Sequence, residues 1–563
     1  MSGLTRRTLL ARAGMAAAAL YLLESRLSPA RAAGWSEQEY WAFADRMQSL
    51  LDGAWRETEG AYVTGAAGET SHNANLLYTH AAAAQRGHIG PARQDERARR
   101  LVRRLCASPP WATTLTGTDA GCPSAQPGAR ALRPQKHACG WGAMLHTTQG
   151  QHVVVDTAVV RGLARAYHAR EALGLGPDDV ALIRDRVTKA ANSTFYAYPA
   201  LRLNQINWPI EIYAHAVAVG GDPHLLRHDC RLQLTRFADA LTRPAPGMRV
   251  PNTGPGYRFH YLPQFSDSKP TNYDSAEYAT IVCGALLFYE QAVAAGMTKL
   301  NREQVARLRA WVERVVCGYW THAGYLNWDT GLGFTRWHQI KKPPLSQQSL
   351  LAVALSPRLQ PSAAYGRWAR HLFDRALESF DRLVAEHGGV PPQVMFGITR
   401  TPSADGDPHL AAARMQANAA QAAVLGLGRI AAEVPPPLYA FDPDTGRLAV
   451  TTPAYNTAIV PVNQGAFPYG GVELARLFDG DQRIAANVGG RPPAAFGVVV
   501  RDRRSGHQTA SQRGRARPDL RRPPLRLLEA PRGAVARPVA YPRRPYAGPF
   551  RRLEAIGTTR GRT

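Results

Sequence analysis

The chain has 563 residues, of which 45% are hydrophobic and 20% charged, values that are typical of a globular protein and exclude a coiled coil, a collagen-like chain and wholesale disorder. The length suffices for two or three domains. The net charge of +25 is uneven, because residues 501–563 carry +13 and residues 1–33 carry +4, which leaves only +8 for the body. This distribution speaks against nucleic-acid binding by the body and is compatible with an acidic substrate.

The N-terminus has the pattern of a twin-arginine export signal. The pair Arg6-Arg7 precedes an apolar stretch, Ala13 to Leu23, that is shorter than the roughly 18 residues of a membrane span. Ala30-Arg31-Ala32 then supplies a small-x-small cleavage site. We expect residues 1–32 to be removed after export, which gives a periplasmic or extracellular protein with no stable membrane insertion; an anchor that stays attached is the alternative.

Residues 34–432 are expected to form a helical domain. Ser36 and Glu39 make a capping box ahead of apolar residues at three- and four-residue spacing, and Asn301 with Gln304 marks another helix start. The run Gly220 to Pro223 ends one helix and begins the next, which is typical of an antiparallel hairpin. Further helical patterns lie near residues 70–86, 93–106, 153–173, 177–193, 209–219, 223–242, 273–296, 301–319, 346–355, 364–387 and 408–432.

The cysteines and the usual cofactor motifs argue against bound groups. No Cys-x-x-Cys pair occurs, so structural zinc is not expected, and Walker, dinucleotide-binding, His-Glu-x-x-His and Gly-x-Ser-x-Gly patterns are missing from the sequence. Cys106, Cys122 and Cys139 bracket a loop and could form a disulfide in an oxidising compartment, with the pairing open. Cys283 and Cys317 lie in apolar helical runs and are expected in the core. We therefore predict neither metal nor cofactor.

The segment from Asn204 to Glu211 is the first of three that could carry chemistry. Pro209 suits the first position of a helix, so Asn204 and Asn207 are expected in the preceding loop, where their amides can face a cleft. Trp208 beside them is a candidate for contact with a substrate. A helix-capping role for Asn207 is the alternative.

The second segment runs from Tyr257 to Tyr261 and concentrates phenols, an imidazole and a guanidinium within five positions. In an extended chain Arg258 and His260 would face one way and the two tyrosines the other. Tyr273 begins the next helical pattern. The alternative is an aromatic plug with a satisfied histidine.

The third segment lies between Tyr325 and His338. Trp328 and Trp337 flank Asp329 and Arg336 in a turn-rich stretch between helices. Indole rings can cover the apolar face of a sugar while polar neighbours bind its hydroxyls. A hairpin anchored by buried tryptophans is the alternative.

After the prolines at 435–437 the pattern changes to short β-rich runs separated by turn residues, such as Leu438 to Phe441, Leu448 to Thr452 and Thr457 to Val460. We expect a β-sheet domain over residues 437–500. Residues 501–563 are rich in Arg and Pro and predict a disordered tail, consistent with a shifted reading frame. A polyanion-binding tail is the alternative.

Helical hairpins followed by a sheet domain, together with these three segments, resemble the toroidal polysaccharide lyases, such as the alginate, heparin and hyaluronate lyase groups. The resemblance implies a mainly α monomer, in which an (α/α) toroid precedes a smaller, antiparallel β-sandwich-like domain. The change to a basic sequence after Val500 is consistent with a truncation of that second domain. Lyases of this kind bind the uronate carboxyl through an Asn, often in an Asn-Asn-His run; here Gln205 stands where the His might follow. The run Arg258-x-His260-Tyr261 looks like the Arg/Tyr/His segment of alginate lyases.

The resemblance also implies a reaction, β-elimination on an acidic glycan. Such a site neutralises the uronate carboxylate, stabilises the developing enolate, and supplies a base and an acid. The catalytic residues implied are Asn204, Asn207 and Arg336 for the carboxylate and His260 with Tyr261 for proton exchange. The substrate-binding residues implied are Trp208, Tyr257, Arg258, Tyr273, Trp328, Asp329 and Trp337.

Two other functions remain open. An inverting glycoside hydrolase on the same toroid needs two carboxylates roughly 6.5 to 9.5 Å apart, for which Glu211, Asp274, Glu277 and Asp329 are candidates. A non-catalytic envelope protein could instead bind glycans through the tryptophan-rich loops. All three functions require the three segments to open onto one groove at one mouth of the toroid.

Overall fold

The structure is a computed structural model that describes residues 34–65, 68–107, 141–142, 144–145, 153–191, 203–242, 283–297, 300–322, 324, 343–386, 388–389, 408–442, 447–460, 473–474, 476–479, 484–487, 500–501 and 508–509. The predicted export signal and most of the C-terminal tail therefore lie outside the described residues.

Helices dominate the described chain up to residue 430, as the sequence predicts. They are α2 (Glu37–Leu51), α3 (Glu69–Gln85), α4 (Asp95–Ala107), α5 (Val153–His168), α6 (Arg170–Leu173), α7 (Pro177–Ala191), α8 (Leu203–Ala218), α9 (Pro223–Thr242), α11 (Ala285–Ala294), α12 (Arg302–Tyr319), α13 (Pro343–Ala354), α14 (Ala363–Glu386) and α15 (Pro408–Val424), with the short 3-10 helices η1 (Asp52–Ala54) and η7 (Leu427–Arg429). A small hairpin, β1 (Trp55–Arg56) and β2 (Ala61–Tyr62), precedes α3.

The helix boundaries follow from local chemistry. The Ser36 hydroxyl accepts from the Glu39 backbone N–H at 3.3 Å, and the Glu39 carboxylate accepts from the Ser36 N–H at 2.6 Å, so the predicted capping box is confirmed. Asn301 and Gln304 form the same pair at 2.8 and 3.1 Å at the start of α12. Gly220, with a φ of 95°, lies in the short turn between α8 and α9.

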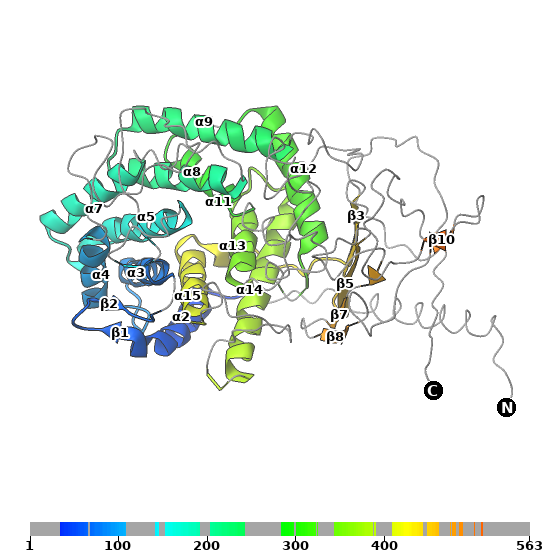
Figure 1. Cartoon of the computed structure of the whole chain (residues 1–563), viewed down its shortest axis with the longest axis horizontal. Helices are drawn as coiled ribbons and strands as arrows, with labels where there is room; N and C mark the ends of the chain where they lie inside the picture. Colours follow the sequence, from blue (N-terminus) through cyan, green and yellow to red (C-terminus); the bar gives the residue numbers. More distant parts are fainter. Residues whose placement is uncertain are drawn as a thin grey trace.

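The helices form a closed ring with two layers (Figure 1). The inner layer runs α3, α5, α8, α11, α13 and α15; each of these helices packs on the next, and α15 returns to pack on α3. The outer layer consists of α2, α4, α7, α9, α12 and α14, which alternate with the inner helices along the chain. This closed alternation is an (α/α) toroid, so the toroid part of the predicted fold is confirmed.

The inner helices run in the same direction around the ring. Arg165, near the C-terminus of α5, donates to Gln85 at the C-terminus of α3, and Arg86 just beyond α3 donates to the Val424 carbonyl at the end of α15. Arg358, just after α13, pairs with Glu290 in the second half of α11. The C-termini of these helices therefore meet at one end, which we call the C-terminal end of the ring, and their N-termini lie at the other, the N-terminal end.

Packing differs between the two layers. The outer helix α4 is amphipathic, with Ala98, Leu101, Val102 and Leu105 buried at helical spacing. The inner helix α3 is buried on every side from Glu69 to Ala84, which is why its sequence lacks a single apolar face. Helices α3 and α5 approach closely at Gly162, where an added Cβ would lie 2.6 Å from the Ala74 carbonyl oxygen.

The second part of the described chain is an antiparallel sheet. Its strands are β3 (Leu438–Asp442), β4 (Arg447–Thr451), β5 (Tyr455–Val460), β6 (Glu473–Leu474), β7 (Arg476–Asp479) and β8 (Ile484–Asn487), in the order β3-β4-β5-β7-β8 with β6 also paired to β5. The first three match the predicted runs. The sheet packs on α12, and the Thr451 hydroxyl donates to the Trp320 carbonyl at 3.0 Å.

Beyond this sheet, the described residues hold a two-residue antiparallel pair, β9 (Val500–Arg501) with β10 (Gln508–Thr509). In the part of the chain that the structure describes, no helix is both long and apolar enough to cross a membrane. Cys106 is buried and not bridged, whereas Cys122 and Cys139 lie outside the described residues. Cys283 is buried in the core, as expected.

The predicted start of α8 is wrong. The sequence places Pro209 at the first helical position, but α8 begins at Leu203 and Pro209 lies inside it. Proline lacks only one backbone N–H donor, and the preceding turn of α8 forms at the N-terminal end of the ring in spite of it. Asn204 and Asn207 are consequently helical residues and do not belong to a preceding loop.

Candidate functional site

Most of the predicted site residues lie outside the described chain. These are His260, Tyr261 and Arg336 among the catalytic candidates, and Tyr257, Arg258, Tyr273, Trp328, Asp329 and Trp337 among the substrate-binding candidates. Asn204 belongs to α8, but only its backbone is described. Asn207 and Trp208 are described in full, and both side chains are buried.

The order of the helices indicates at which end of the ring the three predicted segments are attached. Residues 243–282 and 325–342 join outer helices to the inner helices α11 and α13, whose N-termini lie at the N-terminal end of the ring. Asn207 lies in the first half of α8 and therefore near the same end. The described helices thus bring the attachment points of all three predicted segments to one end of the toroid.

Asn207, Glu211 and His215 follow one another at four-residue spacing and so share one face of α8. That face meets α5, because Arg161 of α5 donates to Glu211 through two hydrogen bonds of 2.8 and 2.9 Å. We call these residues, together with Arg165 and His168 of α5, the inner-wall cluster.

Asn207 has an unusual environment for a buried amide. Its exposed fraction is 0%, yet neither its side-chain nitrogen nor its oxygen has a hydrogen-bond partner within the described structure. A buried amide without partners costs roughly 1 to 3 kcal/mol. Such a cost is more readily understood at a place where a ligand supplies the partners than in a purely structural core.

The neighbouring ion pair is fully formed. Burial alone would raise the pKa of Glu211, but the Arg161 guanidinium and the His215 ring outweigh it, so this pKa is lowered and the carboxylate stays ionised. The His215 Nε2 atom lies 3.5 Å from Glu211 Oε1, longer than a good hydrogen bond. An ionised, paired carboxylate is poorly suited to act as the general acid of a hydrolase.

Further along α5 the wall becomes cationic. Arg165 donates to the Gln85 side-chain oxygen at 2.8 Å and to the Tyr78 hydroxyl at 3.2 Å, and its guanidinium lies 5.1 Å from the centre of the Tyr78 ring. Burial, together with the nearby charges of Arg165 and His215, lowers the pKa of His168 to about 4. Arg161 and Arg165 are not among the residues predicted from sequence, although their four-residue spacing on a helix is a signal that indicates a shared face.

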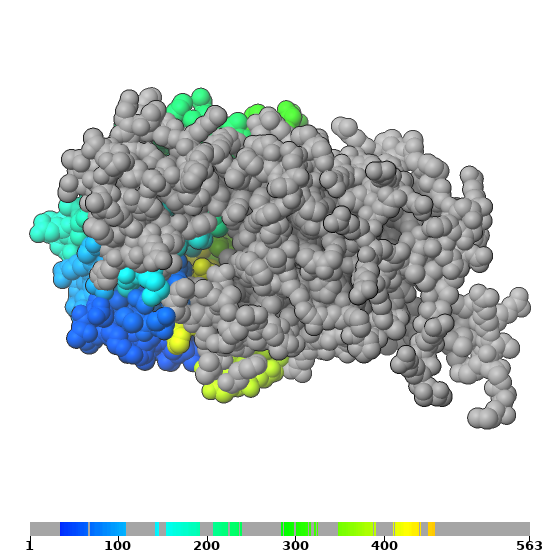
Figure 2. Space-filling model, viewed as in Figure 1, coloured from blue at the N-terminus to red at the C-terminus, as the bar shows by residue number. Residues whose placement is uncertain are grey.

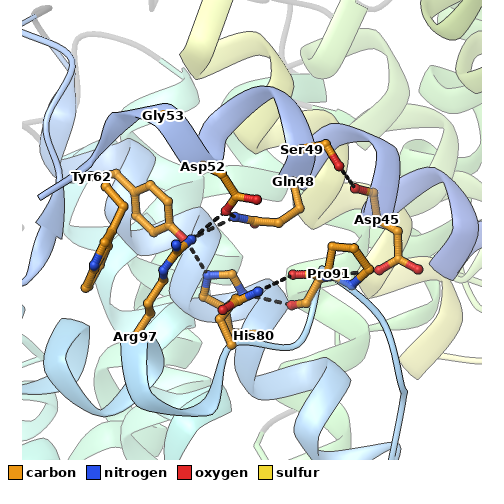
Figure 3. Close-up of polar contacts among 12 residues, drawn as sticks. Asp45, Gln48, Ser49, Asp52, Gly53, Tyr62, His80, Pro91 and Arg97 are labelled. Carbon is orange, nitrogen blue, oxygen red and sulfur yellow. Dashed lines mark hydrogen bonds and ion pairs between the residues drawn. The ribbon is translucent and has the colours of Figure 1, made fainter. Parts of the chain in front are cut away.

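A second polar cluster contains the residue types expected of a lyase, but in a different place. Figure 3 shows Tyr62, His80 and Arg97 converging with Asp52 and Gln48. The Tyr62 hydroxyl lies 3.0 Å from His80 Nε2, and it accepts from Arg97 and from Gln48 at 3.1 Å each. We call this group the seam cluster, because it joins α2, α3 and α4, and Gln416 of α15 extends it by donating to Gln48 at 3.0 Å.

The seam cluster is a structural feature. His80 Nδ1 lies 2.8 Å from the Ala92 carbonyl and must donate to it, so Nε2 is left to accept the Tyr62 proton. Burial raises the pKa of Tyr62 and lowers that of His80 to about 4. Both side chains are buried, with exposed fractions of 1% for Tyr62 and 0% for His80. In Figure 2 the segment α2 to α4 forms the lower left of the molecule, coloured blue.

Neither cluster resembles a metal centre. Among the described residues no three His, Cys, Asp or Glu side chains gather so that they could hold a metal ion. The inner-wall cluster supplies one carboxylate, already held by Arg161. What the wall offers instead is an amide without partners and an excess of positive charge.

The comparisons with known proteins identify no family. No family model and no curated protein matches the chain. Among solved structures, the chain is similar to a family 88 glycosyl hydrolase from Bacteroides vulgatus, with a TM-score of 0.41, 9% identity and coverage of 69% of this chain and 100% of that one. It is also similar to a polysaccharide lyase, with a TM-score of 0.38, 10% identity and coverage of 68% and 97%.

A third similar structure is the cellobiose 2-epimerase of Bacillus thermoamylovorans B4167, with a TM-score of 0.40, 11% identity and coverage of 69% and 100%. At these TM-scores and identities the similarity assigns neither a family nor an activity to this chain.

Proposed function

We propose that the protein is an exported polysaccharide lyase that cleaves an acidic, uronate-containing glycan by β-elimination. It acts after removal of residues 1–32, in the periplasm or outside the cell, as a monomer. The observation that carries the proposal is Asn207, an amide at the N-terminal end of the ring that is buried and has no partner within the described structure.

The chemistry of β-elimination gives Asn207 a role. The proton removed lies α to the uronate carboxyl, and its acidity rises when the carboxylate charge is neutralised or hydrogen-bonded. An amide nitrogen can donate to a carboxylate oxygen as the negative charge shifts onto it. Asn204 and Arg336 complete this role in the proposal, and His260 with Tyr261 exchange the protons.

Sugar contacts in the proposal come from Trp208, Tyr257, Arg258, Tyr273, Trp328, Asp329 and Trp337. The ionised Glu211 does not exchange protons here, because it is held by Arg161. It fixes the part of α8 that carries Asn207, one turn away.

The test is a panel assay on the purified chain that begins after residue 32. Polymers of different uronic acids are incubated with it, and the ultraviolet absorbance of an unsaturated uronate product is followed. A lyase produces rising absorbance on at least one polymer, and Asn207→Ala lowers the turnover by roughly a hundredfold through loss of one oxyanion contact.

Other outcomes identify the alternative functions. New reducing ends without any absorbance change would show hydrolysis and overturn the lyase proposal, and Asp329→Ala should then abolish turnover. Saturable polymer binding without any product would indicate a glycan-binding protein. The matched control is Gln233→Ala on the outer helix α9, which should leave turnover unchanged because α9 lies outside the inner ring.

A further inference from the structure

The inner wall holds three nitrogen-bearing side chains that the proposed elimination does not use. Arg165 and His168 lie in the last turn of α5, and His215 lies in the last turn of α8, so all three are near the C-terminal end of the ring. Asn207 lies eight residues before His215, or roughly 12 Å along a helix.

Arg165 donates to two neutral groups within the described structure. The acceptors that it reaches within the described structure are the Gln85 amide oxygen and the Tyr78 hydroxyl. Its buried Nε atom has no hydrogen-bond partner there. A guanidinium offers five donors in a planar fork, so Arg165 keeps donor capacity suited to a two-oxygen anion.

His215 and His168 extend the same surface. Both Glu211 oxygens already accept from Arg161, and the buried His215 Nε2 has no hydrogen-bond partner within the described residues. His168 is exposed and lies within electrostatic range of Arg165 and His215. The cluster therefore brings two nitrogen groups, one of α5 and one of α8, within electrostatic range of His168, and the carboxylate beside them, Glu211, is already held by Arg161.

The helix dipole explains only part of this arrangement. Cations near a helix C-terminus are favourable by about 0.3 to 1 kcal/mol, which accounts for the presence of basic residues there. It does not account for the buried Arg165 Nε and His215 Nε2 atoms, which have no hydrogen-bond partner within the described residues, because exposed cations would serve the dipole equally well.

We propose that Arg165, His168 and His215 form a binding site for an oxyanion, a carboxylate or a sulfate group, on the inner wall at the C-terminal end of the ring. Arg165 supplies the fork, and the two histidines supply single donors. The site lies about two helical turns below Asn207 and does not depend on the proposed lyase activity.

The experiment titrates the full mature chain with sodium sulfate and with sodium glucuronate, each against sodium chloride at matched ionic strength. Calorimetry gives the affinity, and the ring resonances of the histidines report the place of binding. We expect saturable binding with one site. A stronger response to glucuronate identifies a sugar acid as the source, and an equal response identifies the oxyanion alone.

Variants localise the site. Arg165→Gln should weaken binding tenfold or more, Arg165→Lys should weaken it less because it keeps the charge, and Arg302→Gln on the exposed first turn of α12 should leave it unchanged. If Arg165→Gln does not fold, the histidine resonances of the wild type provide the test, because the ring resonances of His168 must shift until the anion site is saturated. No saturable binding of either anion, or equal binding by Arg165→Gln and Arg302→Gln, overturns the site. A negative lyase assay with positive anion binding would remove only the proposed function.

Discussion

The seam cluster and the inner-wall cluster contain the same kinds of side chain in opposite states. At the seam, the Tyr62 hydroxyl gives its proton to His80 and accepts from Arg97 and Gln48, so its hydrogen-bonding capacity is used completely. On the inner wall, the Asn207 amide has no partner within the described structure. Residue type alone would have favoured the seam as an active site, whereas unused capacity points to the wall.

The difference follows from the position of each cluster in the toroid. The seam joins α2, the first described helix, to α15, the last described α-helix, through Gln416, which donates to the Ala44 carbonyl and to the Gln48 side chain. The wall belongs to α5 and α8, which pack on each other in the middle of the chain and take no part in the closure of the ring. The seam therefore serves closure of the ring, whereas the wall between α5 and α8 is the surface that we propose for binding.

The largest expected effect concerns the ion pair of the inner wall. Glu211→Ala leaves the Arg161 guanidinium without its carboxylate in a buried place, which should lower the free energy of unfolding by about 3 to 5 kcal/mol. Urea denaturation measures this. The double variant Arg161→Met/Glu211→Leu removes both charges and should recover most of the loss; a double variant as unstable as Glu211→Ala would show that packing, and not the charge, is responsible.

The next effect tests the seam through pH. Burial lowers the pKa of His80 in the folded protein to about 4, against an ordinary value near 6.5. Below pH 6.5 the unfolded chain therefore binds a proton that the folded chain does not, and stability falls as the pH drops toward 4, by roughly 3 kcal/mol for this group.

Two variants isolate this contribution. His80→Gln should flatten the fall in unfolding free energy between pH 7 and pH 4, whereas His228→Gln, at an exposed position on α9, should leave the fall as in the wild type. Denaturation series at several pH values give both slopes. Parallel slopes for wild type and His80→Gln would mean that the seam histidine is protonated at no cost.

Much of the fold could be predicted from sequence, because the residues that begin, end and bury a helix lie close together in the chain. Capping at Ser36 and Asn301 and the glycine turn at Gly220 fixed helix boundaries to within a residue or two. Pro209 misled the prediction at α8 because a general preference for the first helical turn was taken as a boundary. Ring closure through α15 and α3 is a long-range contact that no local pattern contains.

The candidate site was less accessible to sequence reasoning. Asn207 was selected for its residue type and remains the centre of the site, but its place within a helix and its lack of partners are properties of the packed ring. Arg161 and Arg165 were not selected, since an arginine on a helix is ordinarily a solvated residue. The pairing of Arg161 with Glu211, fifty positions away, depends on α5 lying beside α8.

The smallest expected effect is a difference in stability between variants of Asn207 on the inner wall and of Tyr62 at the seam. Asn207→Leu removes a buried amide that has no partner within the described structure and replaces it with an apolar side chain of similar size, so the free energy of unfolding should rise by about 1 kcal/mol while turnover of a uronate polymer falls. Tyr62→Phe should have the opposite effect, because it removes the hydrogen-bond partner of His80 and of Arg97. We expect the free energy of unfolding to fall by about 1 to 3 kcal/mol with turnover unchanged. Urea midpoints and ultraviolet product formation, measured on both variants, separate the two roles. If Asn207→Leu proves as destabilising as Tyr62→Phe, then the Asn207 amide has hydrogen-bond partners in solution. The inner wall would then not be the binding surface.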